Sequence, residues 1–280
     1  MPCSRRRLLL AGLAALGCHA HAADADVPHV RILFLGNSYM ATNGLPAMVG
    51  ELLLSSKLLA PHIASYLLGS YKLEQHATDP NVLKLLKQGA DDGRPWDVVV
   101  VQEQSVISSL AGVDEDAQQY MSGGLSKLVA LAREVNPKVL VVDFQVWARH
   151  ESLWVKKSPE ALSTGASPDV AHARIRLANA KAVKAALEKN PGANILVSPV
   201  GDFWQLVHDM YPALPLHAED GTHPDTLGTL LSALVIAGSI GGRDVIEQAT
   251  WMPPDCPVLQ VARVKKMLLD HPEVFKNAGK

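Results

Sequence analysis

Five short apolar segments recur along the chain, and longer segments with a helical spacing of apolar residues separate them. Each apolar segment is continuous rather than alternating, which is typical of strands buried on both faces of a parallel sheet. Strands that alternate with helices fold into a sheet with helices on both faces. The sequence therefore predicts an α/β fold, a three-layer α/β/α sandwich around a parallel five-stranded sheet. The predicted strands are residues 31–35, 63–68, 97–101, 138–144 and 194–198, and the predicted helices are residues 45–59, 81–88, 116–135, 170–189 and 224–240.

One connection between these elements is unusually long. Residues 148–168 lie between a strand and a helix and include Trp154 and two prolines. Connections of this length in a compact domain are commonly functional or disordered. Two interpretations stay open for this segment, the rim or lid of a site and a plain insertion.

The amino terminus has the pattern of a targeting segment. Arg5, Arg6 and Arg7 precede an apolar run over residues 8–17, and the small residues Ala20 and Ala22 follow. This pattern predicts a signal peptide over residues 1–22 and a mature domain over residues 23–280. The apolar run is shorter than the roughly 20 residues that span a bilayer, and no later stretch is long enough, so no membrane span is predicted. The predicted location is secreted or periplasmic.

The signal segment allows two routes of processing. The arginines after Ser4 resemble a twin-arginine export signal, whereas the residues before Cys18 resemble a lipoprotein signal. Ordinary cleavage is the favoured prediction, and lipidation of Cys18 is the alternative. Cleavage also removes Cys3 and leaves Cys256 alone, so the mature domain is predicted to have no internal disulfide.

Composition and charge exclude several classes of protein. The chain is 48% hydrophobic and 19% charged, which are globular values rather than those of a disordered chain. Its formal net charge is −2 and becomes −5 when the three signal arginines are removed. A nucleic-acid binder needs a basic field to displace counterions from phosphates, so none is predicted. The sequence gives no reason to infer a protein partner.

Polar residues follow the predicted strands at the points where the strands end. In an open α/β sheet the ligand site lies at these carboxyl ends. The polar residues occur in four groups, which are residues 36–38, 69–70, 102–105 and 145–150. His76 and Glu103 are candidates for hydrogen bonds that support such a site, with a solvated surface position as the alternative.

Ser38 directly follows the first predicted strand. A serine at a tight strand-to-helix turn can project its hydroxyl towards nearby backbone amides, which is what a nucleophile for acyl transfer requires. The alternative is that Asn37 and Ser38 only cap the following helix, a common role for these residue types. The turn motif alone does not decide between the two.

Asp220 and His223 lie three residues apart near the other end of the domain. This spacing allows both side chains to lie on one side of a single turn. The imidazole could then take a proton from a serine while the carboxylate orients the ring. The alternative is an ordinary turn, with Thr222 capping the helix that follows.

Together these segments resemble the SGNH, or GDSL-like, hydrolase superfamily. The resemblance depends on Gly36, Asn37 and Ser38 after the first strand and on the segment 220–223, and the predicted sheet extends it over nearly the whole mature chain. It implies a flavodoxin-like sheet, with Ser38 as nucleophile, His223 as general base and acid, and Asp220 as its partner. The family motif usually has aspartate before the serine, and Asn37 replaces it here.

The resemblance also implies an oxyanion hole made of three donors. The Ser38 amide is one, and Gly69 is the counterpart of the glycine in the second family block. The third block usually supplies an asparagine, and here Gln104 within residues 102–105 is the candidate, with a side chain one methylene longer. A tryptophan such as Trp147 also belongs to the pattern and is predicted to bind substrate, with packing in the core as the alternative.

Other catalytic patterns are absent from the sequence. It contains no GxSxG nucleophile turn, no HExxH metal helix and no GxxxxGK[ST] phosphate loop. His217, Asp220 and His223 could be considered as metal ligands, but nothing completes a tetrahedral set with conventional spacing. We therefore predict no metal and no organic cofactor.

The sequence predicts a secreted serine esterase that hydrolyses carboxylic esters through an acyl-enzyme. The predicted partner is a small-molecule or carbohydrate ester, and deacetylation of a carbohydrate is one such reaction. Two alternatives stay open. One is a carbohydrate-binding protein that has this fold without catalysis. The other is an acyltransferase that uses the same three residues.

Overall fold

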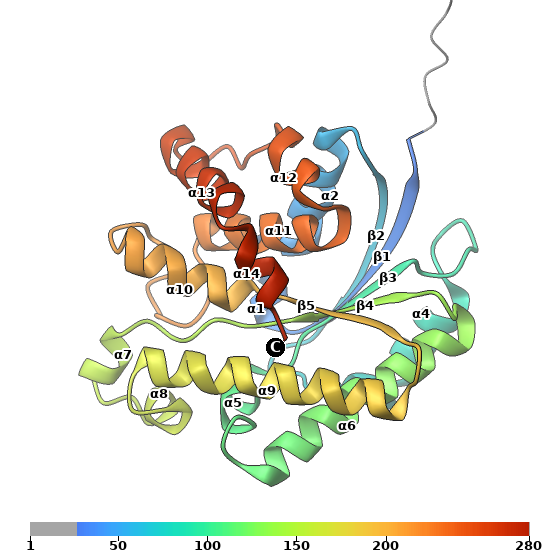
Figure 1. The fold of residues 1–280 in the computed structure, drawn as a ribbon, viewed down its shortest axis with the longest axis horizontal. Coiled ribbons are helices and arrows are strands. Elements are labelled where there is room, and N and C mark those ends of the chain that lie inside the picture. The colour runs from blue at the N-terminus through green and yellow to red at the C-terminus, as the bar shows by residue number, and fades with distance from the viewer. Residues whose placement is uncertain (1–26, 280) are drawn as a thin grey trace, which may run out of the picture.

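The computed structural model describes residues 27–279, so the predicted signal peptide lies outside the described residues. Figure 1 shows a sheet between two layers of helices. The strand order is β2-β1-β3-β4-β5, and every neighbouring pair is parallel. The predicted α/β sandwich and its five strands are therefore confirmed. The strands are β1 (His29–Gly36), β2 (Ala60–Leu67), β3 (Val98–Val101), β4 (Leu140–Phe144) and β5 (Asn194–Ser198).

Helices of the two layers come from different parts of the chain. One face of the sheet is covered by α2 (Leu45–Ser56), α10 (Val200–Met210), α11 (Thr226–Gly241), α12 (Arg243–Gln248) and α13 (Val258–Asp270), with α14 (Pro272–Asn277) packed beside them. The other face is covered by α3 (Leu73–Thr78), α4 (Pro80–Gln88), α5 (Ser105–Leu110), α6 (Glu115–Val135) and α9 (Pro168–Lys189). The short α1 (Ser38–Ala41) and a 3₁₀ turn (Thr42–Gly44) connect β1 to α2.

The core lies on both faces of the sheet because the strands alternate between two apolar environments. In β1, Ile32 and Phe34 pack against the α2 and α11 layer, while Leu33 and Leu35 pack against the α6 and α9 layer. All four side chains are 0% exposed. This double burial is the physical reason that the strand sequences are continuously apolar.

The five predicted helices all form, with small differences at their ends. The last of them was expected from residue 224, but α11 begins at Thr226. Asp225 caps it, since its carboxylate accepts a hydrogen bond from the Thr226 N–H at 2.6 Å. Among the described residues, no helix is both long and apolar enough to cross a bilayer.

The long connection 148–168 is folded rather than irregular. It contains α7 (Ser152–Val155) and α8 (Pro159–Thr164). The Trp154 indole donates to the Gly165 carbonyl at 2.8 Å, and the Ser109 hydroxyl of α5 donates to the Thr164 carbonyl at 2.6 Å. The segment also reaches the end of the sheet where the candidate site lies, because the His150 N–H donates to the Gly221 carbonyl at 2.8 Å. It therefore forms part of the rim of that site.

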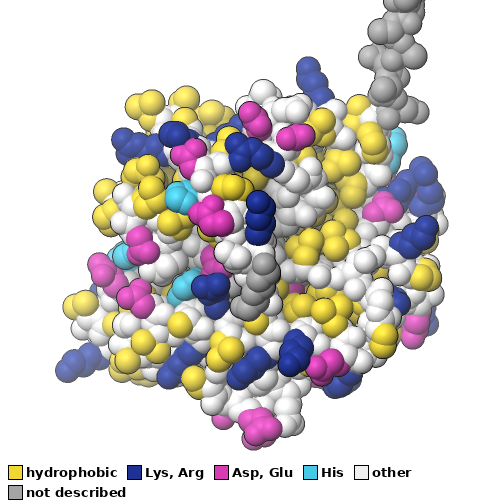
Figure 2. Space-filling model, in the orientation of Figure 1, with side chains coloured by type: hydrophobic (Ala, Val, Ile, Leu, Met, Phe, Trp, Pro, Cys, Tyr) yellow, Lys and Arg dark blue, Asp and Glu magenta, His cyan; other side chains and the backbone are white. Residues whose placement is uncertain are grey.

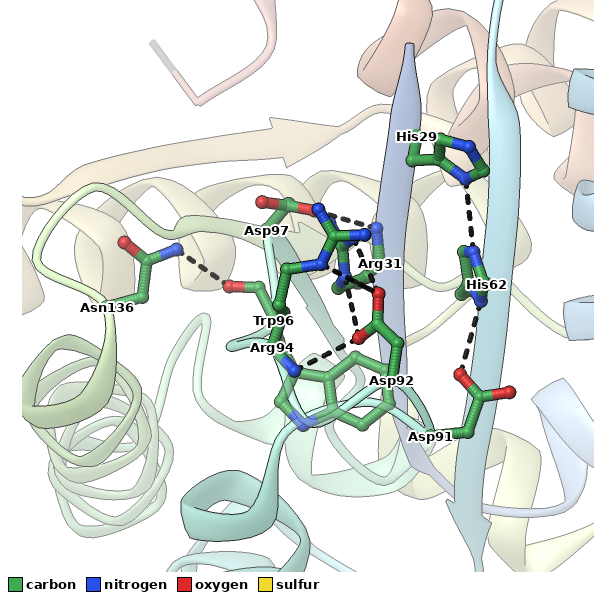
Figure 3. A network of polar contacts seen from close by, with 9 residues as sticks. All are labelled: His29, Arg31, His62, Asp91, Asp92, Arg94, Trp96, Asp97 and Asn136. Carbon is green, nitrogen blue, oxygen red and sulfur yellow. Dashed lines mark hydrogen bonds and ion pairs between the residues drawn. The ribbon is translucent and has the colours of Figure 1, made fainter. Parts of the chain in front are cut away.

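The opposite end of the sheet holds a network of charges (Figure 3). Arg31, at the start of β1, is 5% exposed and forms ion pairs with Asp92 at 2.7 Å and Asp97 at 3.1 Å. These contacts fix the turn that leads into β3. On the exposed side of the same network, His62 lies between His29 and Asp91. Because this network is at the amino ends of the strands, it lies away from the carboxyl ends that carry the candidate site.

Candidate active site

Ser38 is the first residue of α1, immediately after β1. Asn37 caps this helix, since its Oδ1 accepts a hydrogen bond from the Tyr39 N–H at 3.2 Å. Gly36 is required by the close approach of its neighbours, because a Cβ there would lie 2.6 Å from Met40 Sδ and 2.9 Å from Gln102 Oε1. The predicted turn and the alternative of a helix cap are therefore both present, and they place a half-buried serine at the carboxyl end of β1, the neighbour of the central strand β3.

The structure brings the three predicted residues into one hydrogen-bonded chain. His223 Nε2 lies 2.9 Å from Ser38 Oγ, although the two residues are 185 positions apart in the sequence. His223 Nδ1 lies 2.6 Å from Asp220 Oδ2. The second carboxylate oxygen of Asp220 accepts hydrogen bonds from the backbone N–H groups of Thr222 at 2.8 Å and His223 at 2.9 Å. This geometry fits a nucleophile, a base and a group that orients the base.

The electrostatics of Asp220 favour its charged form. Burial acts to raise its pKa, but the hydrogen bonds from the His223 ring and from the two backbone N–H groups outweigh burial and hold the pKa below its usual value. An ionised Asp220 accepts a hydrogen bond from His223 Nδ1–H, and in the neutral ring with this tautomer Nε2 carries no proton. The ring nitrogen that faces Ser38 Oγ is then the one that can accept a proton.

Three stacked aromatic rings support the loop that carries His223. Tyr39 lies edge-on to the His223 ring with centroids 5.6 Å apart, Trp147 stacks on Tyr39 at 4.6 Å, and Trp204 stacks on Trp147 at 4.0 Å. The Trp147 indole donates to the Thr222 carbonyl at 3.2 Å. Trp147 is 1% exposed and both its ring faces are covered, so it cannot stack on a substrate. Its position corresponds to the alternative of core packing and corrects the prediction of a substrate stacked on Trp147, although the residue also borders a cavity beside α10.

Gly69 lies in the exposed turn after β2, next to the nucleophile turn. The Leu68 N–H donates to the Gly36 carbonyl at 3.2 Å, and Asn37 Nδ2 donates to the Tyr71 carbonyl at 3.0 Å. A Cβ on Gly69 would meet no atom within 4 Å, so packing does not require glycine there. These contacts place the Gly69 turn beside Ser38, and its role as an oxyanion donor stays a prediction.

Gln104 caps α5 with its side chain. Its Oε1 accepts hydrogen bonds from the N–H groups of Val106 at 2.8 Å and Ile107 at 3.0 Å. These two contacts fix which end of the side-chain amide is the oxygen, so the Nε2 group is the end that can donate elsewhere. The half-buried Gln104 is thus held in one orientation, and its role as an oxyanion donor also stays a prediction.

Gln102 supports the turn before Ser38, a role that the sequence does not distinguish from the roles of the neighbouring polar residues. It is 0% exposed, its Oε1 accepts a hydrogen bond from the Asn37 N–H at 3.1 Å, and its Nε2 donates to the Glu103 carbonyl at 2.6 Å. It therefore ties the turn before Ser38 to the end of β3. Two glutamines two positions apart carry no pattern that shows which one points inward.

His76 supports the same turn from the other side. It is fully buried, and its Nε2 lies 3.1 Å from the Gly36 carbonyl oxygen, so this nitrogen must carry a proton and donate. Burial lowers the pKa of His76 to about 4, which keeps the ring neutral near neutral pH. The side chain therefore holds the turn and does not lie on a solvated surface.

Two buried carboxyl groups belong to residues near the carboxyl ends of β3 and β4. Glu103 is 1% exposed, and its Oε1 accepts a hydrogen bond from the Gln104 N–H at 2.7 Å. Burial raises the pKa of Glu103 to about 8. Asp143 is fully buried, Asn179 donates to it at 2.8 Å, and burial raises its pKa to about 7. Folding therefore favours the protonated form of both groups.

We expect the substitution Glu103→Gln to remove part of the pH dependence of stability. A carboxyl group with a raised pKa in the folded state stabilises fully below its unfolded pKa, and this stabilisation is lost as the pH rises towards about 8. At about 1.4 kcal/mol for each pKa unit, the wild type should lose a few kcal/mol of unfolding free energy between pH 5 and 8 that the variant keeps. Urea unfolding at several pH values measures this difference. Parallel pH curves for the two proteins would contradict the expectation.

Metal binding has no evident location in the described part of the chain. Residues 27–279 contain no group of three or more His, Cys, Asp or Glu side chains arranged to hold an ion. Of the ligands considered from the sequence, His217 points elsewhere, since its Nε2 donates to the Ala148 carbonyl at 3.0 Å. Asp220 and His223 bind each other.

Comparison with known proteins finds similarity only at the level of structure. No family model and no curated protein sequence matches the chain. A DUF4886 family protein from Bacteroides uniformis matches with a TM-score of 0.65 and 18% identity over 88% of this chain and 95% of its own. A protein from Slackia heliotrinireducens assigned to the SGNH hydrolases matches with a TM-score of 0.53 and 23% identity, over 76% of this chain and 100% of its own.

A third solved structure has the same level of similarity. The lipase Lip_vut3 from a goat rumen metagenome matches with a TM-score of 0.53 and 12% identity, over 77% of this chain and 99% of its own. Identities this low show a shared fold. The predicted resemblance to the SGNH superfamily is therefore confirmed for the fold.

Proposed function

We propose that this chain, whose fold is that of the SGNH hydrolases, is a serine esterase that hydrolyses carboxylic esters through an acyl-enzyme. The observation that carries the proposal is the contact between Ser38 Oγ and His223 Nε2 at 2.9 Å, backed by Asp220 at 2.6 Å from Nδ1. A serine that only caps a helix has no need of an oriented imidazole.

The first step of the proposed reaction forms the acyl-enzyme. His223 Nε2 takes the Ser38 hydroxyl proton as Oγ attacks the ester carbonyl, and Asp220 stabilises the imidazolium that forms. The proposed donors to the resulting oxyanion are the Ser38 and Gly69 N–H groups and the Gln104 side-chain amide. The imidazolium then gives its proton to the leaving alkoxide.

The second step regenerates the enzyme. A water molecule gives a proton to His223 Nε2 as it attacks the acyl carbon. The imidazolium returns this proton to Ser38 Oγ as the tetrahedral intermediate collapses, which releases the acid and restores the serine hydroxyl. An acceptor alcohol in place of water would make the same residues an acyltransferase. Product analysis with and without an acceptor sugar separates the two reactions.

We propose that this reaction takes place outside the cytoplasm, with small-molecule or carbohydrate esters as substrates. The support is the amino-terminal pattern of three arginines, an apolar run and small residues, which predicts cleavage after Ala22. The mass of the protein recovered from the periplasm or medium of an expressing bacterium tests this. An amino terminus at residue 23 is expected, and a lipid-modified Cys18 would favour the alternative.

Covalent labelling tests whether the site is catalytic. A serine-reactive fluorophosphonate should modify Ser38 in the folded protein, because His223 activates this hydroxyl. Peptide mass spectrometry identifies the modified residue, and Ser105, a buried serine at the start of α5, is an internal control that should stay unmodified. Absence of any labelling would favour the carbohydrate-binding alternative without catalysis.

A further inference from the structure

A cavity of about 350 Å³ adjoins the loop that carries the catalytic histidine. Its walls come from the segment after β4, from α10 and from residues 212–221, and neither Ser38 nor His223 lines it. Figure 2 shows histidine and acidic side chains gathered on the surface over α10. Ala218, Glu219 and Gly221 form one wall and flank Asp220. A ligand in this cavity would therefore lie against the back of the triad loop.

His217 gives the cavity a hydrogen-bond acceptor. Its Nε2 lies 3.0 Å from the Ala148 carbonyl oxygen, so this nitrogen carries the proton and Nδ1 does not. Burial lowers the pKa of His217 to about 4, so the ring stays neutral over the physiological range. Among the described residues, no side chain or backbone group donates to Nδ1.

His150 gives the cavity a hydrogen-bond donor. Its Nδ1 accepts a hydrogen bond from the Ser152 N–H at 3.2 Å and lies 2.9 Å from the Ser152 hydroxyl. In the neutral ring the proton is therefore on Nε2. The rings of His150 and His217 are edge to face with centroids 5.4 Å apart. A donor and an acceptor thus lie next to each other in one cavity, which matches the two hydrogen-bonding roles of a hydroxyl group.

The charges around the cavity disfavour an anionic ligand. Glu151 and Glu219 are exposed lining residues. Arg149 also lines the cavity, but Glu160 already neutralises it at 2.7 Å. A metal ion on His150 Nε2 would require the proton to move to Nδ1, where the Ser152 N–H already points. The tautomers therefore favour a neutral hydroxyl-bearing ligand over an anion or a metal.

We propose that this cavity binds a neutral sugar unit of the substrate, on the alcohol side of the ester. The donor and acceptor pair of His150 and His217 would contact neighbouring sugar hydroxyls. Gln205 of α10 also lines the cavity, with its side-chain N–H groups donating to Asp169 and Asp209. The role of the cavity in turnover rests on the proposed esterase function. Binding of a sugar to the cavity does not require esterase activity, so binding and turnover can be tested separately.

Binding is measured on the Ser38→Ala protein, so that no probe is hydrolysed. The probes are xylose, glucose and galactose and their β-linked oligosaccharides, with glucuronic acid as an anion and glucosamine as a cation. Indole fluorescence reports binding, because Trp204 lines the cavity. We expect saturable binding of at least one neutral probe. Binding of the charged probes alone, or of none, would overturn the proposal.

A matched pair of variants tests the donor. His150→Gln keeps an N–H group near the Nε2 position and should bind the neutral probe as the parent protein does. His150→Leu lacks a donor and should bind it about tenfold more weakly, the loss expected for one hydrogen bond. His29→Leu, at the opposite end of the sheet, is the control and should bind normally. Equal binding by the Gln and Leu variants would contradict the assignment of His150.

Turnover separates this proposal from the proposed function. With Ser38 restored, His150→Leu should lower the ratio of kcat/KM for an acetylated oligosaccharide to kcat/KM for an aryl acetate by about tenfold. Sugar binding without hydrolysis of any ester would leave the cavity assignment intact and contradict the esterase. Hydrolysis with an unchanged ratio would leave the esterase intact and contradict the cavity's role in substrate selection.

Discussion

The substitution Ser38→Ala is expected to lower kcat/KM for a short-chain aryl ester by about 10⁴-fold or more, because it removes the atom that forms the acyl-enzyme. The folded structure should be nearly unaffected. Within residues 27–279 the Ser38 side chain makes one hydrogen bond, to His223, and its loss should cost about 1 kcal/mol. Initial-rate kinetics and thermal unfolding of the same preparations measure the two effects.

A matched control is available on the rim of the site. Ser163 is an exposed serine of α8 whose hydroxyl donates to the Glu160 carbonyl within the same helix. Ser163→Ala should therefore keep both activity and stability. Turnover by Ser38→Ala at the wild-type rate would show that Ser38 takes no part in the reaction, whatever the result for Ser163→Ala.

The substitution Asp220→Asn is expected to lower kcat by about 10²- to 10⁴-fold while the fold persists. The carboxylate accepts three N–H groups, those of the His223 ring and of the Thr222 and His223 backbone. An asparagine has one acceptor oxygen. If this oxygen accepts from the two backbone N–H groups, the asparagine NH2 group faces His223 Nδ1 and cannot accept its proton. His223 then loses the hydrogen bond that directs its unprotonated Nε2 towards Ser38.

Thermal unfolding of the same preparations distinguishes this effect from simple loss of packing. Loss of the hydrogen bond that orients His223 should lower kcat without a comparable fall in the melting temperature, whereas lost packing should lower both. Asp209→Asn, at an exposed aspartate on α10, serves as the control. An Asp220→Asn variant within about twofold of wild-type kcat would show that Asp220 does not orient the base.

The sheet could be predicted from the sequence because burial on both faces leaves a clear signal. β3 consists of four consecutive valines, all of them buried. A run of β-branched residues of this length is typical of a strand that is buried on both faces. The long helices α6 and α9 were predictable for a related reason, since 21 and 22 residues contain several turns of apolar periodicity. Their capping residues, Asp114 and Ser167, mark where each begins.

The short helices could not be predicted because their stability comes from tertiary contacts. α7 has four residues and α8 has six, too few to show a helical period. Hydrogen bonds to distant groups hold them, such as the contact between the Ser109 hydroxyl and the Thr164 carbonyl. A segment of this kind looks like a loop until the rest of the fold is known.

The residues of the candidate site also differ in whether the sequence could predict them. Ser38, Asp220 and His223 could be predicted because each lies in a short motif at a strand end or helix start. The supporting residues could not, since Gln102, His76 and Trp147 are polar or aromatic residues whose roles depend on which way they point. The family resemblance predicts a substrate role for Trp147, and the rings stacked on both its faces show that it packs in the core.

The central claim is that Ser38 carries the acyl group during the reaction. The most direct measurement is a rapid acid quench of the enzyme with an aryl acetate, followed by peptide mass spectrometry. We predict an acetyl group on the peptide that contains Ser38, and no such adduct in Ser38→Ala. Steady ester hydrolysis with no acyl group on Ser38, or with the group on another residue, would contradict it.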